Sequence, residues 1–283
     1  VQPQWTFVLF APLVMLALVH FKQTGGAPRW LFKLGVVNLA LILSVRIIII
    51  FGFGFARTYG HLKSYYGFKD WAHAVKQRAG NNYVVMNEGF QNPSKYDYYT
   101  NSLTGFAYDP WYYRRTQFDI WPMEDSIRRK RVYYLFYKPV SGYKNDTIKV
   151  AAGTWYGCWI DDLRTYQKVN FETSQNKVVA SPGQKIVFDL TVSNPYHYPI
   201  TFTNKGYLHP VLLDAIFFTG DKTNVQQASG TFNQISLKPG ETTHYKFTII
   251  APREKGDTEL LFSLRTEPFP GSKNSKMINF TVK

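Results

Sequence analysis

The sequence predicts a multi-domain chain in which two transmembrane helices precede a small α/β domain and an antiparallel β-sandwich. Three observations support this prediction. Two long apolar runs lie within residues 1–56, helical and strand patterns alternate over residues 57–165, and polar and apolar residues alternate over much of residues 166–283. With 283 residues, the chain is long enough to hold a membrane segment and folded domains.

The first apolar run extends from Trp5 to Phe21 and contains no Asp, Glu, Lys or Arg. As a helix it would reach about 25 Å, which is short but sufficient to span a bilayer. A cleavable signal peptide is the alternative, and it requires a preceding basic segment that is not found here. Because the sequence does not begin with Met and enters this run directly, we expect a fragment or a processed product.

The second apolar run, Leu34 to Phe55, contains a single charge at Arg46. Its many Leu, Ile, Val and Phe residues, each contributing about −0.3 to −0.6 kcal/mol, outweigh one arginine at about +2.5 to +3.5 kcal/mol. At 100° per residue, Gly35 and Asn38 lie on the same side as Arg46. That side is expected to face protein or a water-filled cavity. A buried helical hairpin in a soluble protein is the alternative for both runs.

Arg46 has two interpretations. It could be a polar residue that pairs with another helix, or it could contact a lipid-linked phosphate, because a planar guanidinium holds an oxyanion bidentately in a medium of low dielectric constant.

The loop between the two runs is basic. Lys22, Arg29 and Lys33 occur there without any acid, and short basic loops stay in the cytoplasm. Everything after about Arg57 is therefore expected on the other side, which in a bacterium is the periplasm. Trp5 and Trp30 lie where interfacial anchors are expected.

Residues 57–165 predict the α/β domain. The stretch "FKDWAHAVKQRAG" has apolar residues at helical spacing and ends in Gly80, a plausible helix cap, and "NYVVMNE" follows as a buried strand. "NPSKYDYYTN" begins another helix with Asn92 as a possible cap and Pro93 at its first position. A short helix in "WPMEDSIRRK" and strands in "RVYYLFYKP", "GTWYGCWID" and "LRTYQKVNFE" complete the alternation.

The loop "NEGFQNPSKY" leaves the carboxyl end of a predicted strand, a common position for ligands in such sheets. Near it in sequence lie Tyr112, Tyr113, Arg114 and Arg115, which could stack on sugar rings and bind a phosphate or carboxylate. Surface arginines and half-buried tyrosines of a structural domain explain the same residues.

Two carboxylate pairs, Glu124 with Asp125 and Asp161 with Asp162, invite comparison with a glycosidase. Adjacent residues point to opposite faces of a strand and diverge by about 100° on a helix. Neither pair can therefore flank a glycosidic bond by itself.

Residues 166–283 predict the β-sandwich, which is immunoglobulin-like in size. Strict alternation occurs around Ile186 to Ser193, in "THYKFTII", in "ELLFSLR" and in "INFTV", and turn signals such as "SPGQ" and "KPGE" separate these runs. An aromatic cluster, Tyr196, His197, Tyr198, Tyr207 and His209, could form a sugar-binding platform or could fill the end of the sandwich.

The composition argues against several classes of function. The net charge of +14 is spread over all three regions and not concentrated in one stripe, which disfavours nucleic-acid binding. Cys158 is the only cysteine, so an internal disulfide and a multi-cysteine zinc site are excluded. No HxH or HxxxH pair occurs among the six histidines, and we expect no cofactor.

The order of "QPQWT", an apolar helix, a basic turn, a second helix and a soluble tail resembles the end of a multi-spanning glycosyltransferase of family 39. This is the group of dolichyl-phosphate-mannose protein mannosyltransferases and their bacterial relatives. The stretches "YYRRTQFDIWPMEDSIRRKRV" and "LLFSLRTEPFPGSKNS" are similar to the soluble tail of versions from Bacteroides-like bacteria.

The resemblance implies transfer of a sugar from a polyprenyl-phosphate donor to a glycan, lipid or protein acceptor outside the inner membrane. Such enzymes carry their catalytic carboxylate in an early external loop that no position here matches, so we assign no catalytic residue. Members often read Pro-His-Trp at "PQW", where this chain has Gln4. Gln4, Trp5 and Arg46 are candidates for lining the cavity of the lipid phosphate.

Two other functions stay open. One is a membrane-anchored periplasmic module that binds carbohydrate or protein without catalysis. The other is a soluble carbohydrate hydrolase, which would need two carboxylates converging in one cleft of the α/β domain.

Overall fold

The computed structural model describes residues 7–58, 66–87, 89–114, 116–220 and 222–283. The chain forms two compact units, Val1–Tyr66 and Gly67–Lys283, and each is described by itself.

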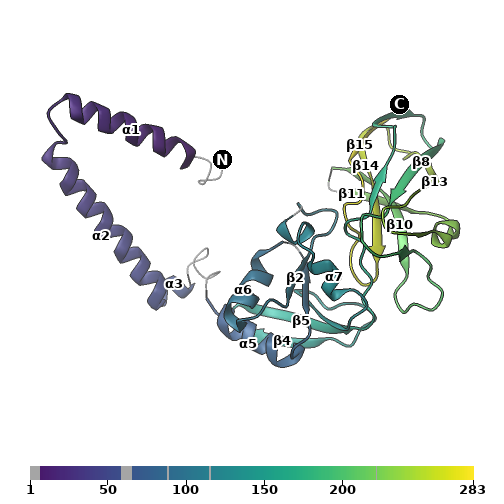
Figure 1. The fold of residues 1–283 in the computed structure, drawn as a ribbon, viewed down its shortest axis with the longest axis horizontal. Helices are drawn as coiled ribbons and strands as arrows, with labels where there is room; N and C mark the ends of the chain where they lie inside the picture. Colours follow the sequence, from purple (N-terminus) through teal and green to yellow (C-terminus); the bar gives the residue numbers. More distant parts are fainter. Residues whose placement is uncertain (1–6, 59–65, 88, 115, 221) are drawn as a thin grey trace. The chain divides into compact units, whose positions relative to one another are not determined.

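The first unit is helical. It contains α1 (Phe7–Gln23), α2 (Arg29–Phe51) and α3 (Gly54–Thr58), with a short turn between α1 and α2 (Figure 1). The helix α2 begins before the predicted Leu34 and ends before the predicted Phe55. Gly52 stops it by adopting φ +60° and donating its N–H to the carbonyl of Ile48, a left-handed cap that glycine adopts without a Cβ clash.

Within the described residues, α2 is the one helix long and apolar enough to cross a membrane. None of its residues is buried. The 17 residues of α1 correspond to about 26 Å of helix, against a hydrocarbon core of about 30 Å. The described part of the chain therefore contains one candidate membrane helix, and the second predicted span stays a prediction.

The second unit begins with a five-stranded mixed sheet. Its strands are β1 (Val84–Asn87), β2 (Gly105–Tyr108), β3 (Val132–Phe136), β4 (Asp146–Val150) and β5 (Gly153–Ile160). The order across the sheet is β2-β1-β3-β5-β4. The pairs β1 with β2 and β1 with β3 are parallel, whereas β3 with β5 and β5 with β4 are antiparallel.

The two faces of this sheet are covered differently. The helices α5 (Phe68–Ala79) and α6 (Gln91–Thr100) pack on one face, where Trp71 and Tyr96 meet Val84 and Met86. The opposite face carries α7 (Met123–Ile127), the 3-10 turn η2 (Gln117–Asp119) and the loop that holds Phe269. Because side chains alternate along a strand, β1 supplies Val85 and Asn87 to this second face.

Most elements predicted for residues 57–165 are present. Gly80 ends α5 as expected, with its N–H bonded to the carbonyl of Lys76. The helix α6 begins at Gln91 after Phe90, so Asn92 is not its cap and Pro93 lies in the first turn. Proline is tolerated there because the first N–H groups of a helix have no partner within it. In "LRTYQKVNFE" only β6 (Asn170–Glu172) is a strand.

The rest of the second unit is rich in β-structure. The following bounds define its remaining elements: β7 (Lys177–Ala180), β8 (Lys185–Ser193), β9 (Ile200–Thr201), β10 (Val211–Thr219), β11 (Lys222–Gln227), η3 (Gly230–Gln234), β12 (Ser236–Leu237), β13 (Thr242–Ile250), β14 (Gly256–Thr266) and β15 (Ile278–Val282). One sheet has the order β11-β10-β14-β15-β7 and another the order β13-β8-β6. The sequence predicted an antiparallel sandwich, but one pair of strands, β15 and β7, runs parallel.

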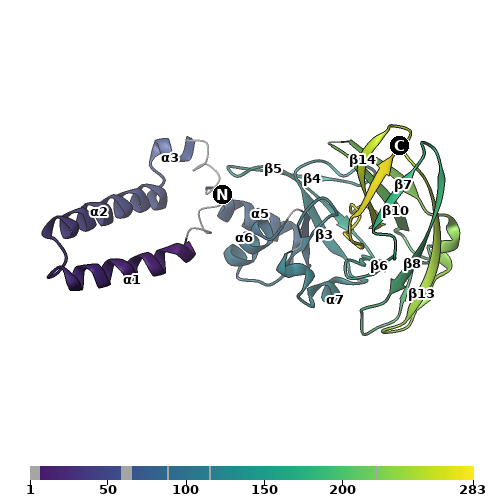
Figure 2. The same cartoon turned by 90° about the horizontal axis from the view of Figure 1, so that it is seen from above.

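These two sheets share one apolar core. Phe188 of β8 and Phe247 of β13 contact Phe262 of β14, with ring centroids 5.2 and 5.7 Å from it. The alternation read from the sequence is observed, since Phe188, Leu190 and Val192 are all buried. Figure 2 shows the two sets of strands at the carboxyl-terminal end of the unit.

A segment after β14 joins the α/β sheet to the β-rich region. The N–H of Trp111 bonds to the carbonyl of Gly271, and the Ser272 hydroxyl donates to the Tyr108 hydroxyl at 3.0 Å. The buried Asn274 side chain donates to the carbonyls of Tyr166 and Val169. Residues that close the sequence of the unit therefore complete the packing of its beginning.

Candidate functional site

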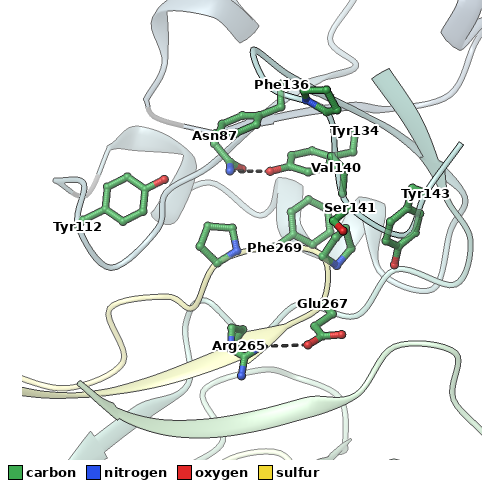
Figure 3. Close-up of a pocket in the computed structure, with 13 residues that line it drawn as sticks. Asn87, Tyr112, Tyr134, Phe136, Val140, Ser141, Tyr143, Arg265, Glu267 and Phe269 are labelled. Atoms are coloured by element: carbon green, nitrogen blue, oxygen red, sulfur yellow. Dashed lines mark hydrogen bonds and ion pairs between the residues drawn. The ribbon is translucent and has the colours of Figure 1, made fainter. Parts of the chain in front are cut away.

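A cavity of about 540 Å³ lies beside the carboxyl ends of β1 and β3, on the sheet face opposite α5 and α6 (Figure 3). The last residues of these strands, Asn87 and Phe136, line it. Arg265, Glu267 and Phe269, which follow β14 or end it, form the facing wall. The cavity is therefore built where the α/β sheet meets the β-rich region.

Asn87 places an amide in the wall of this cavity. Its Nδ2 donates to the hydroxyl of Tyr134 at 2.6 Å, while its Oδ1 has no hydrogen-bond partner within the described structure. The side chain is only 6% exposed. A buried polar atom without a partner costs about 1–3 kcal/mol, so a ligand that donates to this amide would recover that cost.

Aromatic rings surround the amide. Tyr134 contacts Phe269 with ring centroids 4.6 Å apart, and Phe269 stacks on Tyr108 at 4.9 Å. Burial raises the pKa of Tyr134 well above its ordinary value, so its hydroxyl stays protonated. Tyr143 and the half-exposed Tyr112 complete the aromatic lining.

Arg265 and Glu267 bring charge to the opposite wall. The Nε of Arg265 contacts the buried Asp214 at 2.7 Å, and its Nη1 contacts Glu267 at 3.0 Å. Burial acts to lower the pKa of Arg265, but the two carboxylates outweigh it and raise the pKa. The guanidinium is therefore held in place by Asp214, while the half-exposed Glu267 is freer to exchange its partner for a ligand.

The loop after β2 positions Tyr112, and a buried carboxylate fixes this loop. Asp109 accepts hydrogen bonds from the N–H of Gly89 at 3.0 Å and from the Thr116 hydroxyl at 2.5 Å. Gly89 has φ +88°, and a Cβ there would lie 2.5 Å from the Tyr113 hydroxyl. The strand-to-helix loop after β1 thus requires glycine against this tyrosine.

The structure separates the four residues predicted to bind sugar or acceptor. Tyr112 lines the cavity. Tyr113 does not line it, and its ring packs over Gly89. Arg114 is exposed on the same loop without lining the cavity, and Arg115 lies outside the described residues. Among the three of these residues that the structure describes, only Tyr112 is brought to the site.

The residues predicted to line a lipid-phosphate cavity belong to the other unit. Arg46 lies within α2, and Gln4 and Trp5 lie outside the described residues.

Sequence reasoning did not identify Asn87, Arg265 or Glu267 as site residues. The position of Asn87 was nevertheless indicated, because it begins the loop expected to hold a ligand. The signal for the other two was weaker. In "RTEPFPG" a basic and an acidic residue interrupt the end of an alternating strand and precede a proline-rich turn.

The carboxylate pairs do not converge on this cavity. Glu124 is 1% exposed and accepts hydrogen bonds from the Thr165 hydroxyl, the Gln167 N–H and the Tyr196 hydroxyl. Asp125 accepts from the Tyr198 hydroxyl at 3.0 Å. These carboxylates join α7 to the segment after β8, so within the described residues the site has the groups to bind a ligand and not a carboxylate pair to hydrolyse one.

The aromatic cluster predicted around Tyr196 is used in packing. Tyr196 and Tyr198 stack at 5.0 Å above α7 and donate to its carboxylates. His209 accepts or donates at both ring nitrogens, 3.1 Å from the Tyr143 hydroxyl and 2.8 Å from the Asp161 carbonyl. These contacts support the interpretation that the cluster fills one end of the β-rich region.

Comparison with known proteins gives little information. No family model matches the chain, and no curated protein matches it. Among solved structures the chain is similar to a β-glucosidase from Listeria innocua in complex with gluconolactone, with 9% identity and a TM-score of 0.22. That alignment covers 42% of this chain and only 16% of the glucosidase, and it carries no argument about fold or function.

Proposed function

We propose that the second unit binds a saccharide in the cavity between Asn87 and Arg265, as the soluble part of a membrane glycosyltransferase that uses a polyprenyl-phosphate sugar. The unpartnered amide oxygen of Asn87 among aromatic rings is the observation that carries the binding proposal. In this proposal the bound saccharide belongs to the acceptor.

The chemistry of the cavity suits a sugar. A pyranose ring presents C–H groups on its faces and hydroxyls around its edge. Aromatic rings such as Tyr112 and Phe269 can pack against the faces, while the amide of Asn87 and the carboxylate of Glu267 bond to hydroxyls. The volume of about 540 Å³ lies within the range of about 300–1,000 Å³ found for small-molecule sites.

The membrane part of the proposal rests on the sequence. We propose that α1 and α2 both span the inner membrane as a hairpin, with the basic turn in the cytoplasm and the second unit in the periplasm. The resemblance to glycosyltransferase family 39 supports the transferase assignment. The core shared by the two sheets supports an immunoglobulin-like sandwich.

A binding titration tests the saccharide site. The full chain in detergent micelles is titrated with a panel of neutral mono- to tetrasaccharides by calorimetry, and the best ligand is compared across variants. Tyr112→Ala removes an aromatic wall and is expected to weaken binding at least about tenfold, corresponding to about 1.4 kcal/mol.

Tyr98→Ala is the matched control, because Tyr98 is 79% exposed on α6 and does not line the cavity. Equal loss of affinity in both variants, or saccharide binding unaffected by Tyr112→Ala, would remove the cavity from consideration.

The lipid-phosphate proposal concerns Arg46. In a transferase assay on the full-length protein, Arg46→Ala should weaken the apparent affinity for the polyprenyl-phosphate sugar. Ser44→Ala is the control, since the Ser44 hydroxyl bonds only to the Ala40 carbonyl of its own helix in the described structure. Unchanged affinity in Arg46→Ala would leave Arg46 a structural residue.

A second candidate is a membrane-anchored binding module without catalysis. It is favoured by the observation that Glu267 is the only carboxylate among the described residues that line the cavity. The complete reading frame distinguishes the two. The transferase requires further upstream spans and an early external loop with Asp or Glu, whereas the anchored module requires neither.

A further inference from the structure

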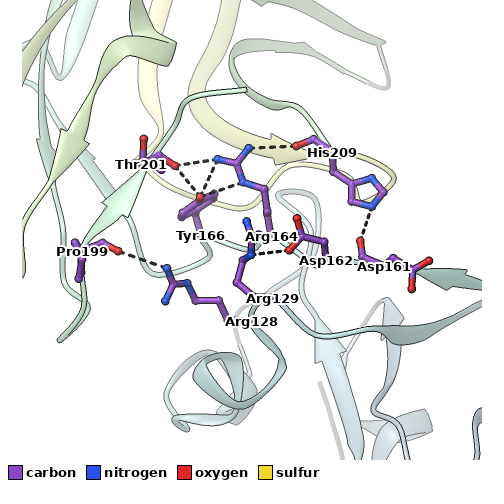
Figure 4. Close-up of polar contacts among 9 residues, drawn as sticks. All are labelled: Arg128, Arg129, Asp161, Asp162, Arg164, Tyr166, Pro199, Thr201 and His209. Atoms are coloured by element: carbon purple, nitrogen blue, oxygen red, sulfur yellow. Dashed lines mark hydrogen bonds and ion pairs between the residues drawn. The ribbon is translucent and has the colours of Figure 1, made fainter. Parts of the chain in front are cut away.

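A second polar cavity lies near His209, whose carbonyl accepts a hydrogen bond from Arg164, and arginines dominate its lining. It has about 20 Å³ and is lined by Arg128, Arg129, Arg164, Tyr166, Thr201 and Tyr207, together with Thr165. Figure 4 shows the polar contacts of the three arginines. No carboxylate is among its described lining residues. A volume of this size holds about one water molecule, or one oxygen of a larger anion.

Arg164 is the most unusual of these residues, because its guanidinium is buried without an acid. Arg164 is 2% exposed, and within the described structure it forms no ion pair with a carboxylate. It donates to the carbonyl of His209 at 3.2 Å, to that of Thr201 at 2.9 Å and to the Tyr166 hydroxyl. Neutral acceptors leave its positive charge uncompensated, which is unfavourable away from water.

Arg164 also has donor capacity left. A guanidinium carries five N–H groups, and four hydrogen bonds engage Arg164, of which Nη1 makes one. The second N–H of Nη1 therefore has no acceptor within the described structure. An anion in the cavity would supply both the acceptor and the charge.

Arg129 adds a second guanidinium in a fixed geometry. Its Nε contacts Asp162 at 2.5 Å, and both residues have positive φ, +60° for Arg129 and +55° for Asp162. The two segments are joined next to this pair, since the N–H of Arg129 bonds to the carbonyl of Leu163, the residue after Asp162, at 2.8 Å. Non-glycine residues held in this region cost energy and occur where the surroundings impose a particular arrangement.

Tyr207 holds two of the guanidiniums together. Its ring centroid is 3.8 Å from the central carbon of Arg164 and 4.6 Å from that of Arg129. The central carbon of Arg128 similarly lies 4.0 Å from the ring of Tyr198. Stacking leaves the edges of a guanidinium, where its donors are, available to an oxyanion.

We propose that this arginine cavity, formed by Arg128, Arg129 and Arg164, binds a phosphoryl group. Three guanidiniums and the Asp162 carboxylate leave a local charge of about +2, which matches a phosphate that carries about −1.5 to −2 at neutral pH. One phosphate oxygen fills the small cavity against Arg164, and the others face Arg128 and Arg129 at its mouth. This proposal does not depend on the saccharide site or on the transferase assignment.

Thermal unfolding of the full chain in detergent micelles tests the proposal with inorganic phosphate as the probe. Phosphate should raise the unfolding temperature saturably, relative to chloride at equal ionic strength. The variants Arg128→Gln and Arg129→Gln should each weaken phosphate binding by about tenfold or more, as expected for a lost charge-assisted hydrogen bond. These two residues are preferred to Arg164, whose replacement could prevent folding.

Arg131→Gln is the matched control. Arg131 belongs to the same basic run, is 56% exposed and pairs with Asp161, but it does not line the cavity. Its variant removes one positive charge from the same region and should bind phosphate like the wild type. An equal effect of chloride and phosphate, or equal losses in all three variants, would overturn the proposal by reducing it to general charge attraction.

A competition arm identifies the source of the phosphoryl group. If glucose 1-phosphate competes with inorganic phosphate and glucose does not, the site accepts a phosphoryl group carried on a larger molecule. If only inorganic phosphate binds, the ligand is the free ion. Either result upholds the site, while binding of glucose with the same affinity as glucose 1-phosphate contradicts it.

Discussion

The two faces of the α/β sheet are built from the same strands and have opposite properties. On the face covered by α5 and α6, Val84 and Met86 are sealed beneath Trp71, which is completely buried. On the other face, Val85 is buried, and Asn87, whose amide oxygen has no partner within the described structure, lines a cavity. The comparison teaches that apolar packing fills one face, while the other face borders a cavity whose walls carry polar groups.

The difference arises from what covers each face. Regular helices present an apolar surface that fits the pleat of a sheet closely. The opposite face is covered by short turns and by the proline-rich loop around Phe269, which belongs to a distant part of the sequence. Short turns and loops fill the surface of a sheet less completely than regular helices do, and the space left unfilled is the cavity.

The largest expected effect on stability is on the closed face of the sheet, the face covered by α5 and α6. Trp71→Ala should lower the free energy of unfolding by about 3–5 kcal/mol, because it leaves a large void beneath α5. Chemical denaturation followed by near-ultraviolet circular dichroism measures the change. His73→Ala, at an exposed position of the same helix, should change the stability by no more than about 0.5 kcal/mol. A loss below about 1 kcal/mol in Trp71→Ala would contradict the distinction between the faces.

A smaller effect on stability is expected in the loop that supports the open face of the sheet, the face that borders the cavity. Gly89→Ala forces a side chain into φ +88°, which costs about 1–2 kcal/mol, and it also displaces Tyr113. The control Gly183→Ala lies in the turn before β8, where φ is +74° and the new methyl group has open space, and Gly183 does not line the cavity. The glycine variants should therefore differ: both lose stability, but only Gly89→Ala should weaken saccharide binding. Normal saccharide affinity in Gly89→Ala would show that this loop does not shape the cavity.

A pH effect is expected at the junction beside the open face. Burial raises the pKa of Glu124 above its ordinary value of 4.5, although three hydrogen bonds oppose the shift. The folded chain therefore binds this proton more tightly than the unfolded chain. The free energy of unfolding should fall as the pH rises from about 4.5 towards the raised pKa.

Glu124→Gln cannot ionise, so it should remove this part of the pH dependence. Its amide oxygen can still accept from the Thr165 hydroxyl and the Gln167 N–H. Denaturation curves at several pH values compare the variant with the wild type. If the free energy of unfolding depended on pH in the same way in both proteins, Glu124 would not be the group responsible.

The smallest effect concerns a buried group on the open face of the sheet. Burial raises the pKa of the Cys158 thiol to about 12, so very little thiolate is present at pH 8. The native chain should resist a thiol reagent at pH 8, while the chain unfolded in urea should react. Rapid labelling of the native chain would show that the open face admits solvent beyond the cavity.

Sequence patterns predicted the elements better than the site. Gly80 correctly marked the end of α5, and alternation correctly identified β8 and β13, because these signals act within one element. The strand β10, "VLLDAIFFT", lacks such alternation, since its central residues are buried on both faces. The periodicity of apolar residues alone therefore did not predict this strand.

The site was predicted only in part, because it is formed by contacts between distant segments. The loop after β1 could be expected to hold a ligand, since it follows the carboxyl end of a strand. That Arg265 and Glu267 face it depends on how the turn after β14 packs on the sheet. In the same way, nothing in the local sequence distinguishes the buried Arg164 from the exposed Arg114.

The most direct test of the central claim uses the double variant Asn87→Leu with Tyr134→Phe. It removes both partners of the 2.6 Å hydrogen bond, and replacing both polar groups by apolar ones is close to neutral for folding. A calorimetric titration of the full chain with the saccharide that binds best should then show affinity weakened by about tenfold or more, at nearly unchanged stability. Wild-type affinity in this double variant would contradict the account.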